Sequence, residues 1–581
     1  MLVAGIAFAL AGWVTSGLWP DPFGRAITVN SSDQALFEWL LAYGAHALTT
    51  GENPLFTYLL NVPDGVNLAV NTSITVYAAA FAPLTLLVGP PVTFLVILVL
   101  NLTATAYAWY WFMSRQLGLS AAAAAVGGLF CGFAPQMISH ANAHLNWTAQ
   151  WLVPLLLWRV MALRQPGRAL RNGLILGGLV AVAFSIAAEA LFFTALACVV
   201  FLGCWAAPRV NRAAARAALP TFVRGLAVTA GTAGVLLAYP LWLHFFGPQR
   251  YHGTGFSHRV HSEDVAAYGA FPARSLAGVL GLDTGLAPNP TEENSFFGIP
   301  LLLLAVACYV MLRRHADPAR WASLRALTVT GVVFAVLSLG PAVKWFGEFT
   351  SLWLPYAVLG ALPVFDAALP ARLALAVTPV IGLLLAYAID CLRAAHGRPR
   401  RITVGWAAAY TAALLPLLPM PLLVTERSPI PHFITSGTWR EYVSDGGVLA
   451  PVPLTADLLP DGQRWQAYAL AARQGEFAIP AGFFLGPGGP DGRGRIGPVP
   501  RSTALLLADV AKSGAVPPLD EADRAAARED LRFWRVEVVI MPDRVDGAKW
   551  PVYVDEVREA TTALLGPPQR VDDVWLWRTP S

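Results

Sequence analysis

The chain has 581 residues, of which 56% are hydrophobic and only 13% are charged, whereas an ordinary soluble domain carries about 25% charged residues. With a mean hydropathy of +0.53 and a net charge of +4, this composition excludes a disordered chain, a soluble enzyme of usual make-up, a secreted disulfide scaffold and a nucleic-acid-binding protein. It predicts a multi-spanning α-helical membrane protein.

The apolar stretches predict eleven transmembrane helices. The first, Met1 to Leu18, has no basic n-region and no clear A-x-A cleavage site, so we expect it to remain uncleaved. The others are expected near 91–113, 121–136, 147–163, 172–190, 191–207, 225–245, 299–312, 326–340, 371–391 and 402–424.

Segment 74–90 is apolar too, but prolines and a Gly-Pro-Pro end interrupt it. We expect it to lie in the membrane surface, because the arginines then separate into two sets. One set of short loops holds seventeen arginines, and the opposite, longer loops hold only Arg25, Arg250, Arg259, Arg274 and Lys344. The positive-inside rule therefore predicts a cytoplasmic N-terminus and an external C-terminus.

Residues 425–581 differ in composition from the rest of the chain, because they hold about half of the acidic residues and no stretch long enough to span a membrane. Strand-like runs at 447–454, 536–541 and 574–577 alternate with helix-like runs at 464–473, 519–533 and 552–565, and 485–500 reads as a Gly/Pro loop. This order predicts a small extracytoplasmic α/β domain.

Asp33 is the strongest candidate for catalysis in the first external loop, 19–73. It stands about fifteen residues past the first span, at the start of an expected amphipathic helix. It is either a base held at the membrane boundary or, with Ser31 and Ser32, an ordinary helix N-cap. Glu38 lies about 140° farther around that helix and need not share a face with Asp33, and we include it as a substrate-binding candidate.

Polar residues near other predicted span ends are further substrate-binding candidates. Asn71 closes an amide-rich segment, 51–73, whose side chains can bind hydroxyl groups or close turns. His140 and His144 are four residues apart, so on a helix they share a face. They can contact a phosphate or a sugar, but without a third ligand nearby they are a weak metal signal.

Glu189 lies between two apolar stretches, where a carboxylate is either functional or solvated at a turn. Glu293 and Asn294 lie at the mouth of the span that follows them. Arg372 is at another mouth, on the side where arginine is scarce, and its guanidinium can clamp a lipid-linked phosphate, pair with Asp366 or snorkel.

The layout resembles the GT-C superfamily of integral-membrane glycosyltransferases. The similarity extends over 1–424 in arrangement, and three runs are similar to actinobacterial GT-C-like membrane proteins: NPLFTYLLNVPDGVNLAVNTS, WYWFMSRQLGLS and FAPQMISHANAHLNWTAQWLVPLLLWRVMALR. The resemblance implies a transmembrane module over 1–424 and a catalytic base in the first external loop, at Asp33. Many members carry two adjacent carboxylates there, whereas this chain has Asp33-Gln34.

The resemblance further implies an inverting transfer of a sugar from a polyprenyl-phosphate donor to a cell-envelope glycan, lipid or protein acceptor on the extracytoplasmic side of the bilayer. No residue is assigned as a metal ligand and no cofactor is required, with a divalent metal left open. The alternatives are a lipid or polysaccharide transporter or flippase, and a non-catalytic membrane scaffold.

Overall fold

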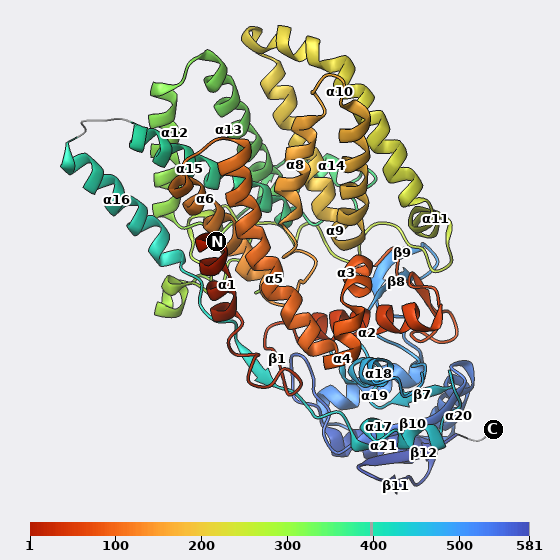
Figure 1. Cartoon of the computed structure of the whole chain (residues 1–581). Helices are drawn as coiled ribbons and strands as arrows, with labels where there is room; N and C mark the ends of the chain where they lie inside the picture. The colour runs from red at the N-terminus through yellow and green to blue at the C-terminus, as the bar shows by residue number, and fades with distance from the viewer. Residues whose placement is uncertain (72, 395–398, 580–581) are drawn as a thin grey trace. The chain divides into compact units, whose positions relative to one another are not determined.

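The computed structural model describes residues 1–71, 73–394 and 399–579. The chain divides into two compact units, whose elements are labelled in Figure 1. We call Met1–Gly17, Ile97–Ala238 and Phe256–Leu422 the helical unit, and Leu18–Val96, Tyr239–Gly255 and Leu423–Ser581 the mixed unit. The boundaries expected from the sequence, 1–424 and 425–581, stay a prediction.

The helical unit is built from long apolar helices with short connections. Its helices are α1 (Leu2–Val14), α5 (Pro90–Trp111), the π-helix η1 (Phe112–Gln116), α6 (Ala121–Phe133), α7 (Pro135–Ala141), α8 (Leu152–Ala162), α9 (Ala169–Ala206), α10 (Arg209–Leu236), η2 (Ala266–Gly269), η3 (Gly278–Leu282), α12 (Ile299–His315), α13 (Pro318–Ser338), α14 (Tyr356–Leu359), η4 (Pro370–Ala376), α15 (Val377–Ala394), α16 (Arg400–Leu414) and η5 (Leu415–Leu417). One hairpin joins β4 (Ala342–Trp345) to β5 (Glu348–Trp353).

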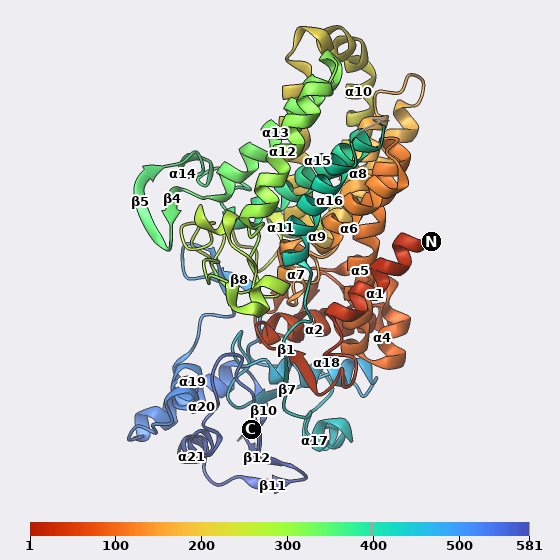
Figure 2. The same cartoon turned by 90° about the vertical axis from the view of Figure 1, so that its left-hand side faces the viewer.

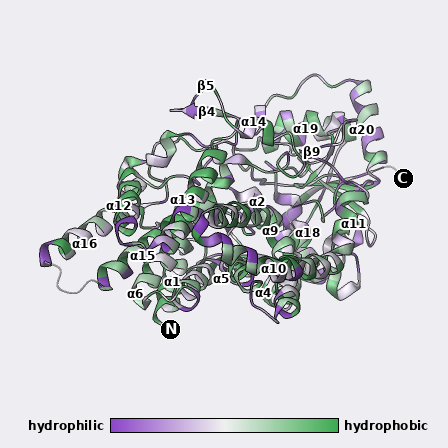
Figure 3. Cartoon of the chain, turned by 90° about the horizontal axis from the view of Figure 1, so that it is seen from above, coloured by the Kyte–Doolittle hydropathy of each residue, from purple (hydrophilic) through white to green (hydrophobic). Residues whose placement is uncertain are grey.

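Six helices among the described residues are long and apolar enough to cross a membrane, so the chain is a multi-pass membrane protein. They are Pro90–Gln116, Ala121–Ala141, Ala169–Ala206, Arg209–Leu236, Pro318–Ser338 and Pro370–Ala394. Viewed by hydropathy, the helices of this unit carry mostly apolar residues (Figure 3).

The expected number of eleven spans is higher than six for two physical reasons. The stretches 172–190 and 191–207 are both helical, but they share the one candidate span Ala169–Ala206, in which two helices meet at the non-helical Ala187 (φ −153°, ψ 74°). Four other stretches form helices shorter than 18 residues, namely α1, α8, α12 and α16. Segment 74–90 folds as two short helices, α3 (Thr75–Ala80) and α4 (Ala82–Val88). The orientation in the membrane stays a prediction.

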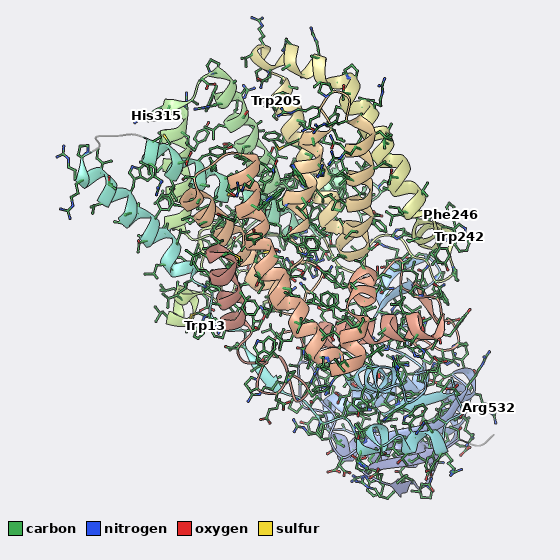
Figure 4. All side chains as sticks on the ribbon, in the orientation of Figure 1. Trp13, Trp205, Trp242, Phe246, His315 and Arg532 are labelled. Atoms are coloured by element: carbon green, nitrogen blue, oxygen red, sulfur yellow. The ribbon has the colours of Figure 1, made fainter. Side chains whose placement is uncertain are left out.

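Small residues allow close helix packing in the helical unit. A Cβ atom on Gly127 of α6 would lie only 2.9 Å from the carbonyl oxygen of Gly382 in α15, so these two helices meet backbone to backbone, as is common between membrane helices. Around them, Phe334 and Leu385 are fully buried in the main hydrophobic core. At one end of the unit, α9 and α12 finish near Trp205 and His315 (Figure 4).

The mixed unit combines short helices with small sheets. Its remaining elements are β1 (Arg25–Ile27), α2 (Ser31–Thr50), β2 (Phe56–Thr57), β3 (Val66–Asn67), α11 (Ala238–Phe246), β6 (Val424–Glu426), α17 (His432–Thr435), η6 (Thr438–Glu441), β7 (Val448–Pro451), α18 (Asp461–Ala471), β8 (Leu485–Gly488), β9 (Arg493–Ile496), α19 (Ser502–Ser513), α20 (Glu521–Phe533), β10 (Val536–Pro542), α21 (Val554–Leu565), β11 (Gln569–Val571) and β12 (Val574–Arg578).

The C-terminal part is a mixed sheet with strand order β11-β12-β10-β7, in which only β7 and β10 run parallel. The three expected strands are confirmed as β7, β10 and β12, and the three expected helices as α18, α20 and α21. The Gly/Pro segment 485–500 is not a plain loop, because it contains the antiparallel hairpin β8–β9.

Candidate functional site

Arg372 is the centre of a largely buried charge cluster in the helical unit. It lies in η4, at the start of the candidate span Pro370–Ala394. Its Nε and Nη2 atoms donate to Oε1 of Glu292 at 2.9 and 2.6 Å, and Nη1 donates to Oε2 of Glu189 at 3.0 Å. The guanidinium therefore joins two carboxylates from segments far apart in the sequence.

Glu189 lies in α9, two residues after the non-helical Ala187 (φ −153°, ψ 74°) at which its two helical parts meet. Its Oε1 atom accepts a hydrogen bond from the backbone N–H of Leu369 at 2.9 Å. A carboxylate in an apolar helix needs such partners, because an isolated charge there is costly. The Glu189 side chain is thus paired although it is 25% exposed, and its functional role stays a prediction.

Glu292 belongs to a segment, 291–296, whose residues are all buried. Its Oε2 atom accepts a hydrogen bond from Nδ2 of Asn294 at 2.8 Å. Burial opposes the ionised form, but Arg372 and the two nearby histidines hold the pKa of the Glu292 carboxyl well below its usual range. Glu292 is therefore ionised at neutral pH.

His140 and His144 complete the cluster. Their Nδ1 atoms are 2.9 Å apart, and Nδ1 of His144 is 4.0 Å from Oε1 of Glu292. Trp147 lies between the histidines and the arginine, stacked on His140 at 5.3 Å and 5.2 Å from the Arg372 guanidinium carbon. The Nε2 atom of His140 is buried without a hydrogen-bond partner among the described residues.

Two more carboxylates lie beside the cluster. Glu293 Oε1 accepts from the Ala273 N–H at 2.9 Å, and burial raises the pKa of Glu293 to about 7. Glu263 Oε2 accepts from the Ser295 hydroxyl at 2.6 Å, and burial raises its pKa well above the usual range. Neighbouring carboxyls whose pKa values are shifted in opposite directions, as those of Glu292 and Glu293 are, are typical of functional sites.

His140, His144 and Glu292 also form a donor set for a divalent cation, since their nearest ligand atoms lie within 4.8 Å of one another. However, Oε1 of Glu292 already accepts two hydrogen bonds from Arg372. A permanent cation thus takes the position next to this carboxylate, and the triad does not fit a metal ion while Arg372 stays in place.

Asp33 lies in the mixed unit, in the first turn of α2. The N-cap is Asn30, so of the two alternatives for Asp33 the structure contradicts the N-cap at Ser31, Ser32 or Asp33. Asn30 Nδ2 donates to Oδ2 of Asp33 at 2.6 Å. Asp457 lies beside this turn of α2, because the Ser32 hydroxyl donates to its carbonyl oxygen, and burial raises the pKa of the Asp457 carboxyl.

Glu38 and Asn71 also belong to the mixed unit, and both hold the fold together. Glu38 is buried and forms a two-pronged ion pair with Arg427, at 3.0 and 3.1 Å. Asn71 exchanges two hydrogen bonds with the backbone of Leu485 in β8, at 2.8 and 2.6 Å. Their predicted substrate-binding roles stay predictions.

A second possible donor set in the mixed unit is His46, Glu52 and Glu476. The Nε2 atom of His46 lies 3.1 Å from Glu52 and 2.8 Å from Glu476. These contacts are those of a histidine shared by two carboxylates, which already accounts for the arrangement.

The structure brings together His140, His144, Glu189, Asn294 and Arg372, which the sequence proposed separately. Glu292 was not selected as a substrate-binding candidate, although it precedes Glu293 directly. Arg372 could have pointed to Glu292, because an arginine placed in an apolar setting needs an acidic partner close by. Of the three alternatives for Arg372, pairing with Asp366 is not found, since Arg372 pairs with Glu189 and Glu292 among the described residues.

The fold is similar over the whole chain to GT-C glycosyltransferases of known structure. The arabinofuranosyltransferase AftD from Mycobacteria matches with a TM-score of 0.60 and 16% identity, covering 100% of this chain and 40% of AftD. Its R1389S mutant matches with a TM-score of 0.57 and 15% identity, covering 100% and 41%. The chain thus spans less than half the length of AftD.

The oligosaccharyltransferase AglB from Archaeoglobus fulgidus, solved with an inhibitory peptide and a dolichol-phosphate, matches with a TM-score of 0.49 and 13% identity, covering 93% of this chain and 69% of AglB. A comparison with curated proteins found no match. One family model, described as "Domain of unknown function (DUF6311)", matches residues 31–415. The chain therefore belongs to the DUF6311 family.

Proposed function

We propose that the chain is a GT-C glycosyltransferase that moves a sugar from a polyprenyl-phosphate donor to a cell-envelope glycan, lipid or protein acceptor on the extracytoplasmic side of the membrane. The observation that carries the proposal is the similarity of the whole chain to the arabinofuranosyltransferase fold, at a TM-score of 0.60. The six candidate spans support it as well, because a polyprenyl lipid is reached from within the bilayer.

In this proposal Asp33 is the catalytic base. It takes the proton from an acceptor hydroxyl as the hydroxyl oxygen attacks the anomeric carbon. The bond between that carbon and the phosphate oxygen breaks, polyprenyl phosphate leaves with the electron pair, and the configuration inverts.

Arg372 has a different task from the one that the sequence suggested first. Three of its N–H groups are engaged by Glu189 and Glu292, and the charges of these three side chains sum to a negative value when all are ionised. The electrostatic attraction between a lipid phosphate and this already neutralised guanidinium is therefore weak. We therefore assign Arg372 as a positioning residue that fixes the two carboxylates.

The experiment is transfer of radiolabelled sugar from polyprenyl-phosphate donors in membranes that contain the full chain, compared with Asp33→Asn. The exchange keeps the side-chain shape and removes one charge near a helix N-terminus, which costs only about 0.3–1 kcal/mol of stability. We expect product of inverted configuration from the wild type and none from the variant.

Asp64→Asn is the matched control, because Asp64 is an exposed carboxylate of the same predicted loop. It should retain full activity. Product from Asp33→Asn would support the transferase activity but would show that Asp33 is not its base. No product from the wild type with any donor would favour the transporter or the scaffold instead.

A further inference from the structure

The hairpin β4–β5, residues 342–353, exposes large apolar side chains. Phe346 is 64% exposed, Leu352 63% and Trp353 73%, and Trp345 is exposed as well. The hairpin projects away from the helices of its unit, as two perpendicular views show (Figures 2 and 3). We call residues 342–353 the aromatic hairpin.

The tip of the aromatic hairpin holds an aromatic residue against its backbone preference. Phe346 and Gly347 form a two-residue turn with φ of +48° and +87°, a geometry that usually selects Asn-Gly. A bulky residue at positive φ is uncommon. Phenylalanine is thus unfavourable at this position both for its backbone and for its exposure to water.

The turn is nevertheless firmly held. The buried carboxylate of Asp264 accepts hydrogen bonds from the N–H groups of Phe346 and Gly347, at 3.1 and 2.7 Å. The exposed position of Phe346 is therefore built into the fold. Strain that the surroundings maintain in this way is a pointer to function.

Apolar exposure occurs on both faces of the aromatic hairpin. Leu352 and Trp353 are neighbours on β5, so their side chains point to opposite faces, and each is mostly exposed. A partner protein or a sugar would cover one face of a two-stranded hairpin. Only a surrounding medium covers both faces and the tip.

The flanking elements locate that medium. The aromatic hairpin begins four residues after the candidate span Pro318–Ser338, and the next candidate span begins at Pro370. Both ends of the connection are thus tied to candidate membrane-spanning helices. Tryptophan at such a position is typical of the membrane–water boundary.

The charged residues in and beside the aromatic hairpin indicate that it enters the membrane only to a shallow depth. Arg259 and Lys344 lie over the Phe349 ring at 4.4 and 5.8 Å, where they complement lipid phosphates. Glu348, which pairs with Trp345 beside the turn, is exposed. A free carboxylate next to the tip opposes entry into the hydrocarbon, so the headgroup–acyl boundary is the depth that suits all of these side chains.

We propose that the aromatic hairpin is seated in the headgroup–acyl boundary of the bilayer, with Phe346 and Trp353 in contact with lipid. This inference does not depend on the proposed sugar transfer. It assigns a binding surface whose ligand is the lipid bilayer itself.

The experiment places the photoreactive analogue p-benzoylphenylalanine at Phe346 or Trp353 in the full chain, reconstituted in phosphatidylcholine–phosphatidylglycerol liposomes. After irradiation, mass spectrometry identifies the adducts. We expect lipid adducts at both positions, several-fold above those from the same analogue at Phe533, an exposed aromatic of α20 in the other unit. Lipid labelling no higher than at Phe533, or crosslinks to protein in its place, would overturn the proposal.

A second variant separates lipid contact from a role in folding. Asparagine accepts positive φ more readily than phenylalanine, so Phe346→Asn should unfold in detergent at the same Tm as the wild type or a higher one. A marked loss of Tm would show that Phe346 stabilises the fold. It would contradict the proposal that Phe346 is unfavourable for folding and serves lipid contact.

Discussion

Arg372 donates two hydrogen bonds to one oxygen, Oε1 of Glu292, although the two residues are 80 positions apart in the chain. This oxygen is buried, and Glu189 takes a third donor of the same guanidinium. Removing one member of a buried ion network leaves the others uncompensated, which typically costs 3–5 kcal/mol. The cluster therefore combines a candidate site with a stability element.

We expect Arg372→Gln to lower the free energy of unfolding by about 3–5 kcal/mol. Arg372→Lys should fall between this variant and the wild type, because an ammonium keeps the charge but loses the planar fork. Thermal unfolding in detergent measures both. The matched control is Arg320→Gln, since Arg320 pairs with Asp317 at the surface and should change stability by less than about 1 kcal/mol. Equal effects at the two arginines would contradict the network.

A chelator should leave the Tm of the wild type unchanged. The reason is that Arg372 already neutralises Glu292, the carboxylate of the only His-His-Glu set found among the described residues. The measurement is thermal unfolding with EDTA and with added Mn²⁺ or Zn²⁺. A metal-dependent rise in Tm that His144→Ala abolishes would show instead that the guanidinium yields its place to a cation.

The raised pKa of Glu293, from its ordinary 4.5 to about 7, makes stability depend on pH. Because the folded pKa lies above the unfolded one, this stabilisation is complete below pH 4.5 and is lost as the pH rises towards 7. Its full size is roughly 3 kcal/mol. The difference in free energy of unfolding between the wild type and Glu293→Gln, followed between pH 4.5 and 8, measures this stabilisation.

We expect Glu293→Gln to gain stability relative to the wild type as the pH increases through this range, because glutamine cannot ionise. Two curves that stay parallel from pH 4.5 to 8 would mean that Glu293 titrates normally in the folded chain.

The sequence predicted the membrane class, the first-loop helix with Asp33 and the main strands of the C-terminal sheet, since hydrophobic periodicity and composition are local properties. It predicted two helical stretches, 172–190 and 191–207, but placed their junction a few residues past Ala187, because the non-helical residue carries no proline or glycine signal. It also placed the segment 291–296 at an open span mouth, whereas tertiary contacts bury every residue of it.

The candidate site could be predicted only in part, because tertiary contacts decide which of its residues meet. His140, His144, Glu189 and Arg372 were each selected as unusual residues in an apolar setting, but which of them meet depends on packing between distant helices. The choice between Glu292 and Glu293 depends on the direction of two neighbouring side chains. No pattern within the segment contains that information.

Glu38 offers a way to separate a structural from a substrate-binding role. Glu38 and Arg427 are both buried, and Arg427 also donates to the carbonyl oxygens of Pro22 and Phe23. We expect Glu38→Gln and Arg427→Met each to cost about 3–5 kcal/mol, because each leaves one buried charge unpaired. The double variant should cost less than the sum, since no charge is left unpaired.

The double variant then decides the role of Glu38. If Glu38 only holds the fold, the double variant, once folded, should transfer sugar at a rate close to that of the wild type. If Glu38 binds substrate, activity should stay low although stability is largely regained, and the loss should appear as a raised KM. Unfolding measured beside transfer kinetics distinguishes the two outcomes, because stability reports the ion pair and KM reports the substrate.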